Sequence, residues 1–325
     1  MSQPFRLMAI IFALFLQGRA SLADDVVRLA IQKTGTVAWE LDVAQSRGLA
    51  KAAGLDLQIE TLATPEALKI ALLGGKADII VSDWLFVSRE RAMGKKLKFY
   101  PYSSAVGAVM VPANSTIANI QDLKGRKLAV AGGPIDKSWL MMQAYAKKSG
   151  VDLKMQAQLL FGAPPLLQQK ALQGEADAIL NYWNFSAALR AHEFRTLLTM
   201  AQVETALGAK APVAMLGYAF SSDFAKSHHD ALNRFLQMTA QAKRILAGSP
   251  QIWAQIGPKI GAPDAATQAI FRTEYSAGIP HRPIPDEEKD AQVLYQVLAD
   301  TGGARLVGSA PKLDPGTFYL QGPGS

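Results

Sequence analysis

The sequence of 325 residues contains no cysteine. A chain without cysteine forms no disulfide, has no thiolate nucleophile and has no cysteine-based metal site. It also lacks the residue that carries the lipid of a bacterial lipoprotein. Its function must therefore depend on oxygen, nitrogen and aromatic side chains, and an exported form would not be lipid-anchored.

Long hydrophobic runs are scarce as well. The apolar stretch LMAIIFALFL at residues 7–16 is too short to span a bilayer as a helix. It follows the positive charge of Arg6, and small residues at Ser21–Ala23 fit a cleavage site, so we interpret residues 1–23 as a signal peptide. A membrane anchor is the alternative. The first mature residue would be Asp24, and we expect a soluble protein of the Gram-negative periplasm.

Catalytic and cofactor motifs are missing too. The sequence has no GxSxG, HExxH, P-loop or GxGxxG pattern. Its four histidines fall in regions predicted to be helix ends or surface, which favours a peripheral role over catalysis or metal binding. They are His192, His228, His229 and His281. We therefore expect no enzymatic activity, no cofactor and no metal.

Charge is sparse and slightly one-sided. Charged residues make up 19% of the chain and the net charge is +7, but the only basic cluster is the short run Gly94–Lys98. Dispersed charge of this kind predicts a solvated surface and no nucleic-acid partner. Hydrophobic residues make up 49% of the chain, enough for a sizeable core and two ordinary domains.

The sequence does contain an internal repeat. GGKADIIVSDW (Gly74–Trp84) returns 99 positions later as QGEADAILNYW (Gln173–Trp183). Upstream, RLAIQ (Arg28–Gln32) resembles KLAVA (Lys127–Ala131) at the same offset. Hydrophobic periodicity predicts strand, loop, helix, strand, helix and strand in each unit, which indicates parallel sheets. Chance similarity between two ordinary α/β units is the alternative to two related lobes.

Two apolar, glycine-containing stretches flank the second unit, at Ser103–Pro112 and Ala211–Phe220. We interpret them as strands that cross between two lobes, so that the chain passes to lobe 2 and returns. This interpretation assigns residues 24–107 plus 217–325 to lobe 1 and residues 108–216 to lobe 2. The helix-rich region after the return is expected to pack on lobe 1 and cover its sheet.

Two phrases resemble a known family. AKAAGLDLQIETLATPEALKIALLGGKADI (residues 50–79) and DLKGRKLAVAGGP (Asp122–Pro134) are typical of ABC-transporter periplasmic substrate-binding proteins of the nitrate, sulfonate, taurine and thiamine-pyrimidine-precursor class. The resemblance covers nearly the whole mature chain. It implies a Venus flytrap fold, in which two α/β lobes close over a small molecule that is delivered to an ABC permease in the inner membrane. It also implies a monomer, which is our expectation for this chain.

The ligand is expected beyond the carboxyl ends of the parallel strands, where helix N-termini point into the cleft. The loops at this edge span residues 33–39, 63–66, 82–84, 132–139 and 181–184. The candidate ligand-binding residues are Thr36, Trp39, Thr64, Ser82, Asp83, Trp84, Gly133, Lys137, Trp139, Asn181, Tyr182 and Trp183. For the threonines and Asp83 the alternative is helix capping, and for the tryptophans it is burial in the core.

The charges of these loops bear on the ligand. Asp83 lies at a strand end, Lys33 and Lys137 are the available cations, and the loops contain no arginine. Aromatic rings with a carboxylate favour a small planar heteroaromatic molecule or an amine, and we expect Trp84 and Trp183 to face each other across it. The alternatives are a sulfonate-type or other oxyanion held by helix N-termini, and an accessory or sensor protein that acts on a periplasmic partner.

Overall fold

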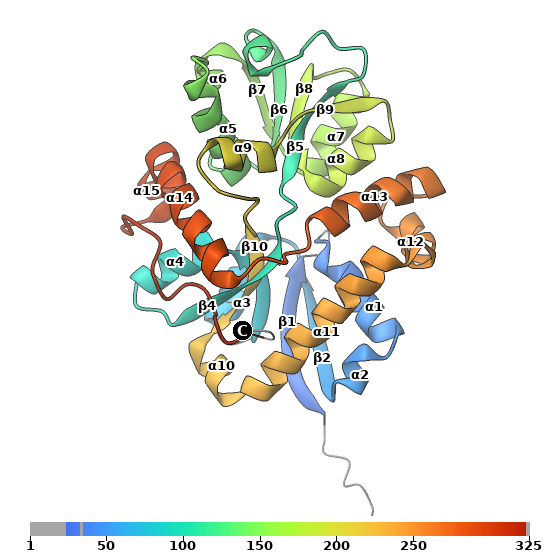
Figure 1. The fold of residues 1–325 in the computed structure, drawn as a ribbon, viewed down its shortest axis with the longest axis vertical. Coiled ribbons are helices and arrows are strands. Elements are labelled where there is room, and N and C mark those ends of the chain that lie inside the picture. Colours follow the sequence, from blue (N-terminus) through green and yellow to red (C-terminus); the bar gives the residue numbers. More distant parts are fainter. Residues whose placement is uncertain (1–23, 33–34, 323–325) are drawn as a thin grey trace, which may run out of the picture.

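The computed structural model describes residues 24–32 and 35–322. The predicted signal peptide, Lys33 and the last three residues lie outside the described residues. The chain forms two α/β lobes, one above the other in Figure 1, each built on a mixed sheet of five strands within the described residues. No helix in that part of the chain is both long and apolar enough to cross a membrane.

The first lobe contains a sheet with the strand order β2-β1-β3-β10-β4. Its strands are β1 (Asp25–Gln32), β2 (Leu55–Leu62), β3 (Ile79–Asp83), β4 (Leu97–Ser103) and β10 (Leu216–Ser221). Strand β1 pairs in parallel with β2 and with the central strand β3, whereas β10 runs antiparallel to β3 and β4. The return strand therefore lies inside the sheet of the lobe from which the chain departed.

The second lobe repeats this arrangement with the order β7-β6-β8-β5-β9. Its strands are β5 (Gly107–Pro112), β6 (Lys127–Ala131), β7 (Gln158–Gly162), β8 (Ala178–Tyr182) and β9 (Phe194–Thr199). Here β6 pairs in parallel with β7 and β8, and β5 runs antiparallel to β8 and β9. The matching orders confirm the predicted α/β fold of two lobes joined by crossing segments.

The residues of the repeated phrase have the same local function in both lobes. Gly75 and Gly174 adopt the left-handed conformation, with φ of 69° and 75°, just after the helix that precedes the third strand. Asp78 accepts a hydrogen bond from the amide of Arg28 at 2.9 Å, and Asp177 accepts one from the amide of Lys127 at 2.7 Å. Part of the repeat is therefore structural, because it ends a helix and ties two neighbouring strands together.

Helices cover both faces of the first sheet. They are α1 (Val37–Ser46), α2 (Leu49–Ala52), α3 (Pro65–Leu73), α4 (Trp84–Ala92), α10 (Ser222–Ser227) and α11 (His229–Gly248). Alternate residues of β1 point to opposite faces: Val27 and Leu29 belong to the cluster formed with α1 and α11, and Ala30 belongs to the cluster formed with α3. The sheet is thus the central layer of the lobe.

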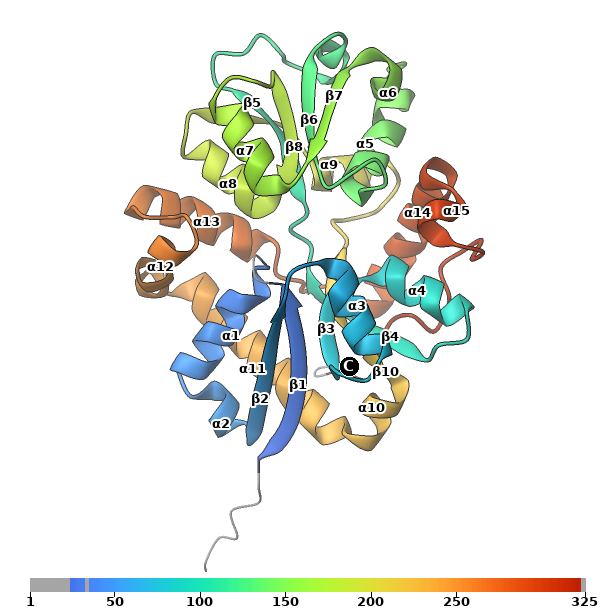
Figure 2. The same cartoon turned by 180° about the vertical axis from the view of Figure 1, so that it is seen from behind.

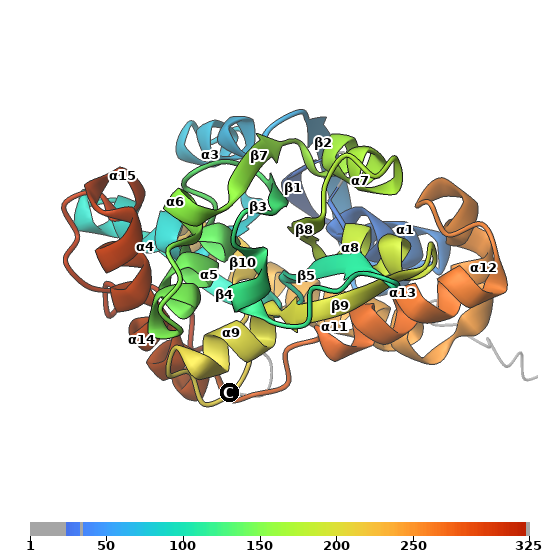
Figure 3. The same cartoon turned by 90° about the horizontal axis from the view of Figure 1, so that it is seen from above.

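Helices of the second lobe are placed in the same way. They are α5 (Lys137–Lys148), α6 (Leu153–Gln156), α7 (Pro164–Leu172), α8 (Trp183–Arg190) and α9 (Met200–Ala206), with a short 3-10 turn η1 (Ile120–Leu123). In Figure 2, α3 of the first lobe and α7 of the second face the same side of the molecule. Seen from above in Figure 3, α9 and α14 lie on the opposite side.

The C-terminal helices connect the lobes. They are α12 (Pro250–Ile256), η2 (Gly257–Lys259), α13 (Ala265–Ala277), α14 (Ile284–Gly302) and α15 (Ala304–Val307). Helix α13 packs against α8, and α14 packs against α5, both in the second lobe, at opposite edges of the molecule in Figure 1. The expectation that this whole region packs on lobe 1 is therefore wrong for α13 and α14, because each has an apolar face that the second lobe buries.

Candidate ligand-binding site

The candidate site lies between the lobes, where the end of β3 meets the start of α5. Asp83 ends β3 and caps α4, because one carboxylate oxygen accepts a hydrogen bond from the amide of Phe86 at 2.8 Å. The other oxygen accepts a hydrogen bond from the ammonium group of Lys137 at 3.0 Å. Lys137 is the first residue of α5. A single carboxylate thus caps a helix of one lobe and forms an ion pair with the other lobe.

Burial and charge act against each other in this pair. Burial alone would raise the pKa of the Asp83 carboxyl, but the ammonium groups of Lys137 and Lys69 lower it below its ordinary value. Burial alone would lower the pKa of Lys137, and the carboxylates of Asp83 and Asp136 raise it. Both members of the pair are consequently charged at neutral pH, although both are largely shielded from water.

A second carboxylate joins the loops of the second lobe. Asp136 caps α5 by accepting hydrogen bonds from the amides of Ser138 and Trp139 at 2.9 and 3.2 Å. The hydroxyl of Tyr182 donates a hydrogen bond to the same carboxylate at 3.2 Å. Burial raises the pKa of Asp136. Gly132 has a φ of 86°, and a Cβ there would lie 3.1 Å from the Tyr182 hydroxyl. The loop that contains Gly132 and Asp136 is therefore joined to Tyr182 by a hydrogen bond and by close packing.

Aromatic rings from both lobes form a cluster. The ring of Trp39, from α1, lies edge-on to the ring of Trp183, the first residue of α8, with centroids 5.6 Å apart. Trp253 lies 5.8 Å from Trp39, and Phe271 lies 6.2 Å from both Trp39 and Trp183. Helix α13 thus completes an aromatic cluster that the repeat alone did not predict.

The predicted pairing of Trp84 with Trp183 is wrong for this structure. Trp84 is fully buried, and its ring lies 6.3 Å from that of Tyr295 on α14. Trp183 belongs to a different hydrophobic cluster, the one that contains Trp253 and Phe271. The two tryptophans occupy equivalent positions in the repeat, but the C-terminal helices that cover them differ. Their surroundings therefore differ as well.

Three other predicted residues are buried inside the second lobe or in β3. Trp139 is 2% exposed and packs against Phe161. Asn181 is 1% exposed, and its amide group donates a hydrogen bond to the carbonyl of Pro164 at 3.1 Å, which fixes the start of α7. Ser82 is 7% exposed. Their contact with a ligand remains a prediction that requires these side chains to become accessible.

The remaining predicted residues lie nearer the surface. Thr64 caps α3 by accepting a hydrogen bond from the amide of Ala67 at 3.2 Å. Thr36 precedes α1, and its hydroxyl lies 3.1 Å from that of Tyr102. Gly133 is half-buried, and a Cβ there would meet no other atom within 4 Å. Gly133 therefore leaves room for a ligand without a backbone conformation that demands glycine.

A buried polar cluster that was not predicted from the sequence lies beneath Thr36. One oxygen of Glu40 accepts hydrogen bonds from Lys243 and from the hydroxyl of Tyr275, both at 2.5 Å, and the other accepts one from Tyr218 at 3.2 Å. The ammonium group of Lys243 also lies 3.8 Å from the ring centroid of Tyr102. The sequence indicates this cluster only through Glu40 on α1 and Lys243 on α11, each a charged residue at an otherwise apolar position of its helix.

A cavity of about 10 Å³ lies in this cluster, large enough for at most one water molecule. Its lining includes Ser103 and Gly278, which belong to segments that connect the lobes. Burial lowers the pKa of Lys243 in spite of its pairing with Glu40. The cluster therefore supports the loop of Thr36 from below and is too small to hold an organic ligand.

Comparisons with known proteins agree with this geometry. The family model described as "NMT1/THI5 like" matches residues 39–252. The crystal structure of the aliphatic sulphonate binding protein SsuA from Escherichia coli is 19% identical, with a TM-score of 0.69 over 88% of this chain and 94% of that chain. The alkanesulfonate-binding protein SsuA from Xanthomonas axonopodis pv. citri, bound to MOPS, is 19% identical, with a TM-score of 0.63 over 89% and 96%.

The same fold also occurs in an enzyme. The desulfurization enzyme DSZB is 13% identical, with a TM-score of 0.58 over 86% of this chain and 92% of that chain. No curated protein sequence matches the chain with significance. At these identities the solved structures establish the two-lobed fold, and the chemistry must be inferred from the side chains of this chain.

Proposed function

The chain belongs to the NMT1/THI5-like family, and we propose that it is a periplasmic solute-binding protein. It closes over one small molecule and delivers this molecule to an ABC permease. The observation that carries the proposal is the ion pair between Asp83 and Lys137, which links the two lobes at the carboxyl ends of their strands. A ligand at this point would contact both lobes and stabilise the closed form. The boundaries proposed for the lobes are residues 24–107 plus 217–325 and residues 108–216.

We propose that the ligand is an amine or a planar heteroaromatic cation. Such a ligand would take the place of the Lys137 ammonium on Asp83, whose carboxylate already accepts a charged donor in this structure. The rings of Trp39 and Tyr182 are half-buried and suit cation–π contact, whereas Trp183 is buried and would have to become accessible. Ligand binding would then exchange one ion pair for another, so that no carboxylate is left buried and unpaired.

A sulfonate or other oxyanion is the second candidate. Lys137 opens α5, so its ammonium group and the positive end of a helix of 12 residues lie together. Two solved proteins with this fold are described as sulphonate-binding and alkanesulfonate-binding proteins. An oxyanion would take the place of Asp83 on Lys137, which is the reverse of the exchange expected for an amine.

Two single substitutions separate these candidates by titration calorimetry against a panel of small amines and sulfonates. For an amine, Asp83→Asn is expected to weaken binding about tenfold to a hundredfold, which is the value of a charge-assisted hydrogen bond of about 1.5–3 kcal/mol. Lys137→Gln would leave amine binding unchanged or tighter, because the competing ammonium is gone. For an oxyanion, Lys137→Gln would weaken binding about tenfold to a hundredfold, and Asp83→Asn would leave binding unchanged or tighter.

Asparagine still caps helices well, so Asp83→Asn should keep the start of α4. Unchanged affinity in both variants for every ligand that the wild type binds would contradict this site. We further propose stoichiometric binding without turnover. The accessory or sensor role differs only in the partner, and a pull-down from solubilised inner membranes would distinguish the two by whether an ABC permease is captured.

A further inference from the structure

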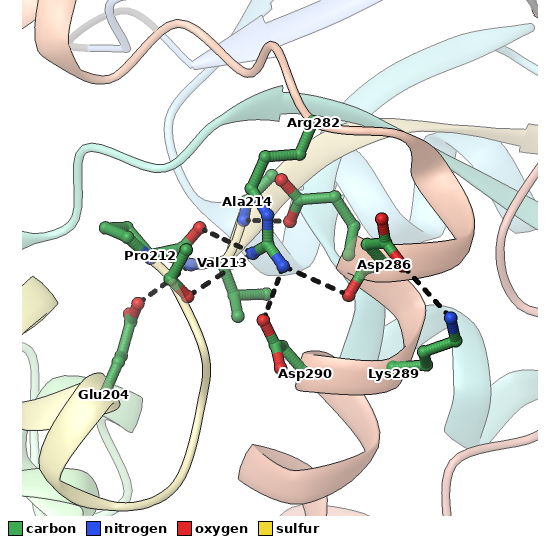
Figure 4. Close-up of polar contacts among 10 residues, drawn as sticks. Glu204, Pro212, Val213, Ala214, Arg282, Asp286, Lys289 and Asp290 are labelled. Atoms are coloured by element: carbon green, nitrogen blue, oxygen red, sulfur yellow. Dashed lines mark hydrogen bonds and ion pairs between the residues drawn. The ribbon is translucent and has the colours of Figure 1, made fainter.

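Two buried carboxylates hold the segment that returns the chain from the second lobe to the first. This return linker comprises residues 207–215, between α9 and β10. Glu204, on α9, accepts a hydrogen bond from the amide of Val213 at 2.9 Å, and Glu287, on α14, accepts one from the amide of Ala214 at 2.9 Å. Figure 4 shows the linker between α9 and the start of α14. Two consecutive amides are thus bound by side chains from two different helices.

A guanidinium group holds the outer side of the same linker. Arg282 lies 3.4 Å from the carbonyl oxygens of both Ala211 and Pro212, and it forms an ion pair with Asp290 at 2.6 Å. Figure 4 shows Arg282 directed at the linker and at Asp290. Side chains therefore bind backbone groups of four successive linker residues, Ala211 to Ala214, and fix the position of the linker.

Glu204 is the electrostatically least favourable residue of this network. Its side chain is fully buried, and within the described residues its second carboxylate oxygen has no hydrogen-bond partner. Burial raises the pKa of Glu204 to about 8, with a smaller contribution from Glu287, although the hydrogen bond from the amide of Val213 acts in the opposite direction. An ionised carboxylate with an unpartnered buried oxygen is unfavourable unless water reaches it. The neutral form, in contrast, satisfies the amide of Val213 without a buried charge.

The charges around Glu204 do not neutralise it. On α5, Lys148 donates its hydrogen bond to the carbonyl of Ala206 at 2.7 Å. Arg282 is bound to Asp290, and Lys289 is bound to Asp286. The other charged or titratable groups near the linker, from its own sequence and from the start of α14, are Lys210, His281 and Glu287. Of these the nearest carboxylate, Glu287, disfavours ionisation of Glu204.

We propose that protonation of Glu204 controls the hinge between the lobes. The neutral carboxyl group holds the return linker against α9. Its ionisation releases the linker and allows the lobes to rotate apart. A surface hollow of about 430 Å³, lined by residues of α9 and by Pro212, lies next to the linker and gives water a route to it. Displacement of the linker changes the direction in which the chain enters β10, which begins at Leu216. Release of the linker thereby moves one lobe relative to the other.

The direction of the effect follows from proton binding. In the unfolded chain Glu204 ionises near its ordinary value of 4.5, whereas in the closed form it ionises near 8. Between these values the closed form retains a proton that an open or unfolded form has lost, so the closed form becomes less stable as pH rises. Above about pH 8 this loss is complete. The inference rests on the lobe movement of the proposed function, but its test needs no ligand, so the two can fail separately.

The absence of cysteine allows a direct measurement. Lys76→Cys and Gln173→Cys place one exposed spin label on each lobe, and pulsed dipolar spectroscopy then gives the distance distribution between the lobes. In this labelled protein without added ligand, we expect the distribution to shift to longer distances as the pH rises from about 6 to about 9, because the closed form loses stability progressively until Glu204 is ionised in it near pH 8. With Glu204→Gln added, which mimics the neutral acid, we expect the short distances to persist at both pH values.

Asp286→Asn is the matched control, because Asp286 lies in the same network but its carboxylate is half-exposed and pairs only with Lys289 among the described residues. It should reproduce the shift of the wild type. A thermal unfolding scan verifies that each variant folds. If Glu204→Gln does not fold, Glu287→Gln is measured instead with a different expectation: it removes the carboxylate that disfavours ionisation of Glu204, so the shift to longer distances should move to lower pH, and an unmoved shift would count against the proposal. A distance distribution that is the same at both pH values in the wild type, or that shifts equally with Glu204→Gln, would overturn the proposal.

Discussion

Gly107 shows how one residue determines the entry into the second lobe. It is the first residue of β5 and has a φ of 152°, and a Cβ at this position would lie 2.1 Å from the carbonyl oxygen of Asn181. No side chain fits so close to a backbone carbonyl. The register of β5 against β8, and with it the position of Tyr182, therefore depends on a glycine here.

We predict that Gly107→Ala destabilises the protein by about 1–3 kcal/mol or more, the usual cost of forcing atoms into a packed site. The matched control is Gly133→Ala, where the added Cβ meets nothing within 4 Å and stability should stay within about 0.5 kcal/mol. Chemical denaturation of both variants measures the difference. Equal stability of the two would show that the backbone around Gly107 can adjust, contrary to this account.

At the scale of elements, the two lobes are held together by more than the crossing segments. Helix α13 contributes Phe271 and Tyr275 to the aromatic cluster around Trp183, and Glu274 forms an ion pair with Arg190 on α8. Helix α14 packs so closely against α5 that a Cβ at Gly302 would lie 2.8 Å from the side chain of Leu140. Apolar packing, and not surface charge, is expected to dominate these contacts.

Phe271→Ala is accordingly predicted to cost about 3–5 kcal/mol, because Phe271 is 2% exposed and its removal leaves a cavity. Arg190→Gln breaks an exposed ion pair and should cost less than about 1 kcal/mol. Urea unfolding curves of the two variants test this ranking. If Arg190→Gln were the more damaging change, the contact between α8 and α13 would be mainly electrostatic and our description of it would be wrong.

The sequence was sufficient to predict the elements but not their partners across the molecule. The repeat at an offset of 99 residues predicted the order of elements in both lobes, since glycine and aspartate at fixed positions have local tasks, as at Gly75 and Asp78. Helix capping, the alternative to ligand contact for Asp83, is present in the structure. The repeat did not predict that Trp84 is buried against Tyr295, because that contact depends on how a distant helix packs.

At the scale of the whole molecule, the contacts between the lobes include one charged contact and one aromatic contact among the predicted site residues. Asp83 and Lys137 form the first, and Trp39 and Trp183 form the second. A ligand that replaced one partner of the ion pair would keep both lobes in contact through itself. The central claim is therefore that this interface captures one small molecule and releases it unchanged.

Native mass spectrometry of protein freshly purified from cells that produce it tests this claim most directly. We predict one small molecule per chain, chemically unchanged after incubation, and markedly lower occupancy in the double variant Asp83→Asn, Lys137→Gln purified in the same way. The double variant removes both charges of the pair together and leaves neither unpaired. A bound molecule that is converted during incubation, or one that the double variant retains as fully as the wild type, would contradict the account.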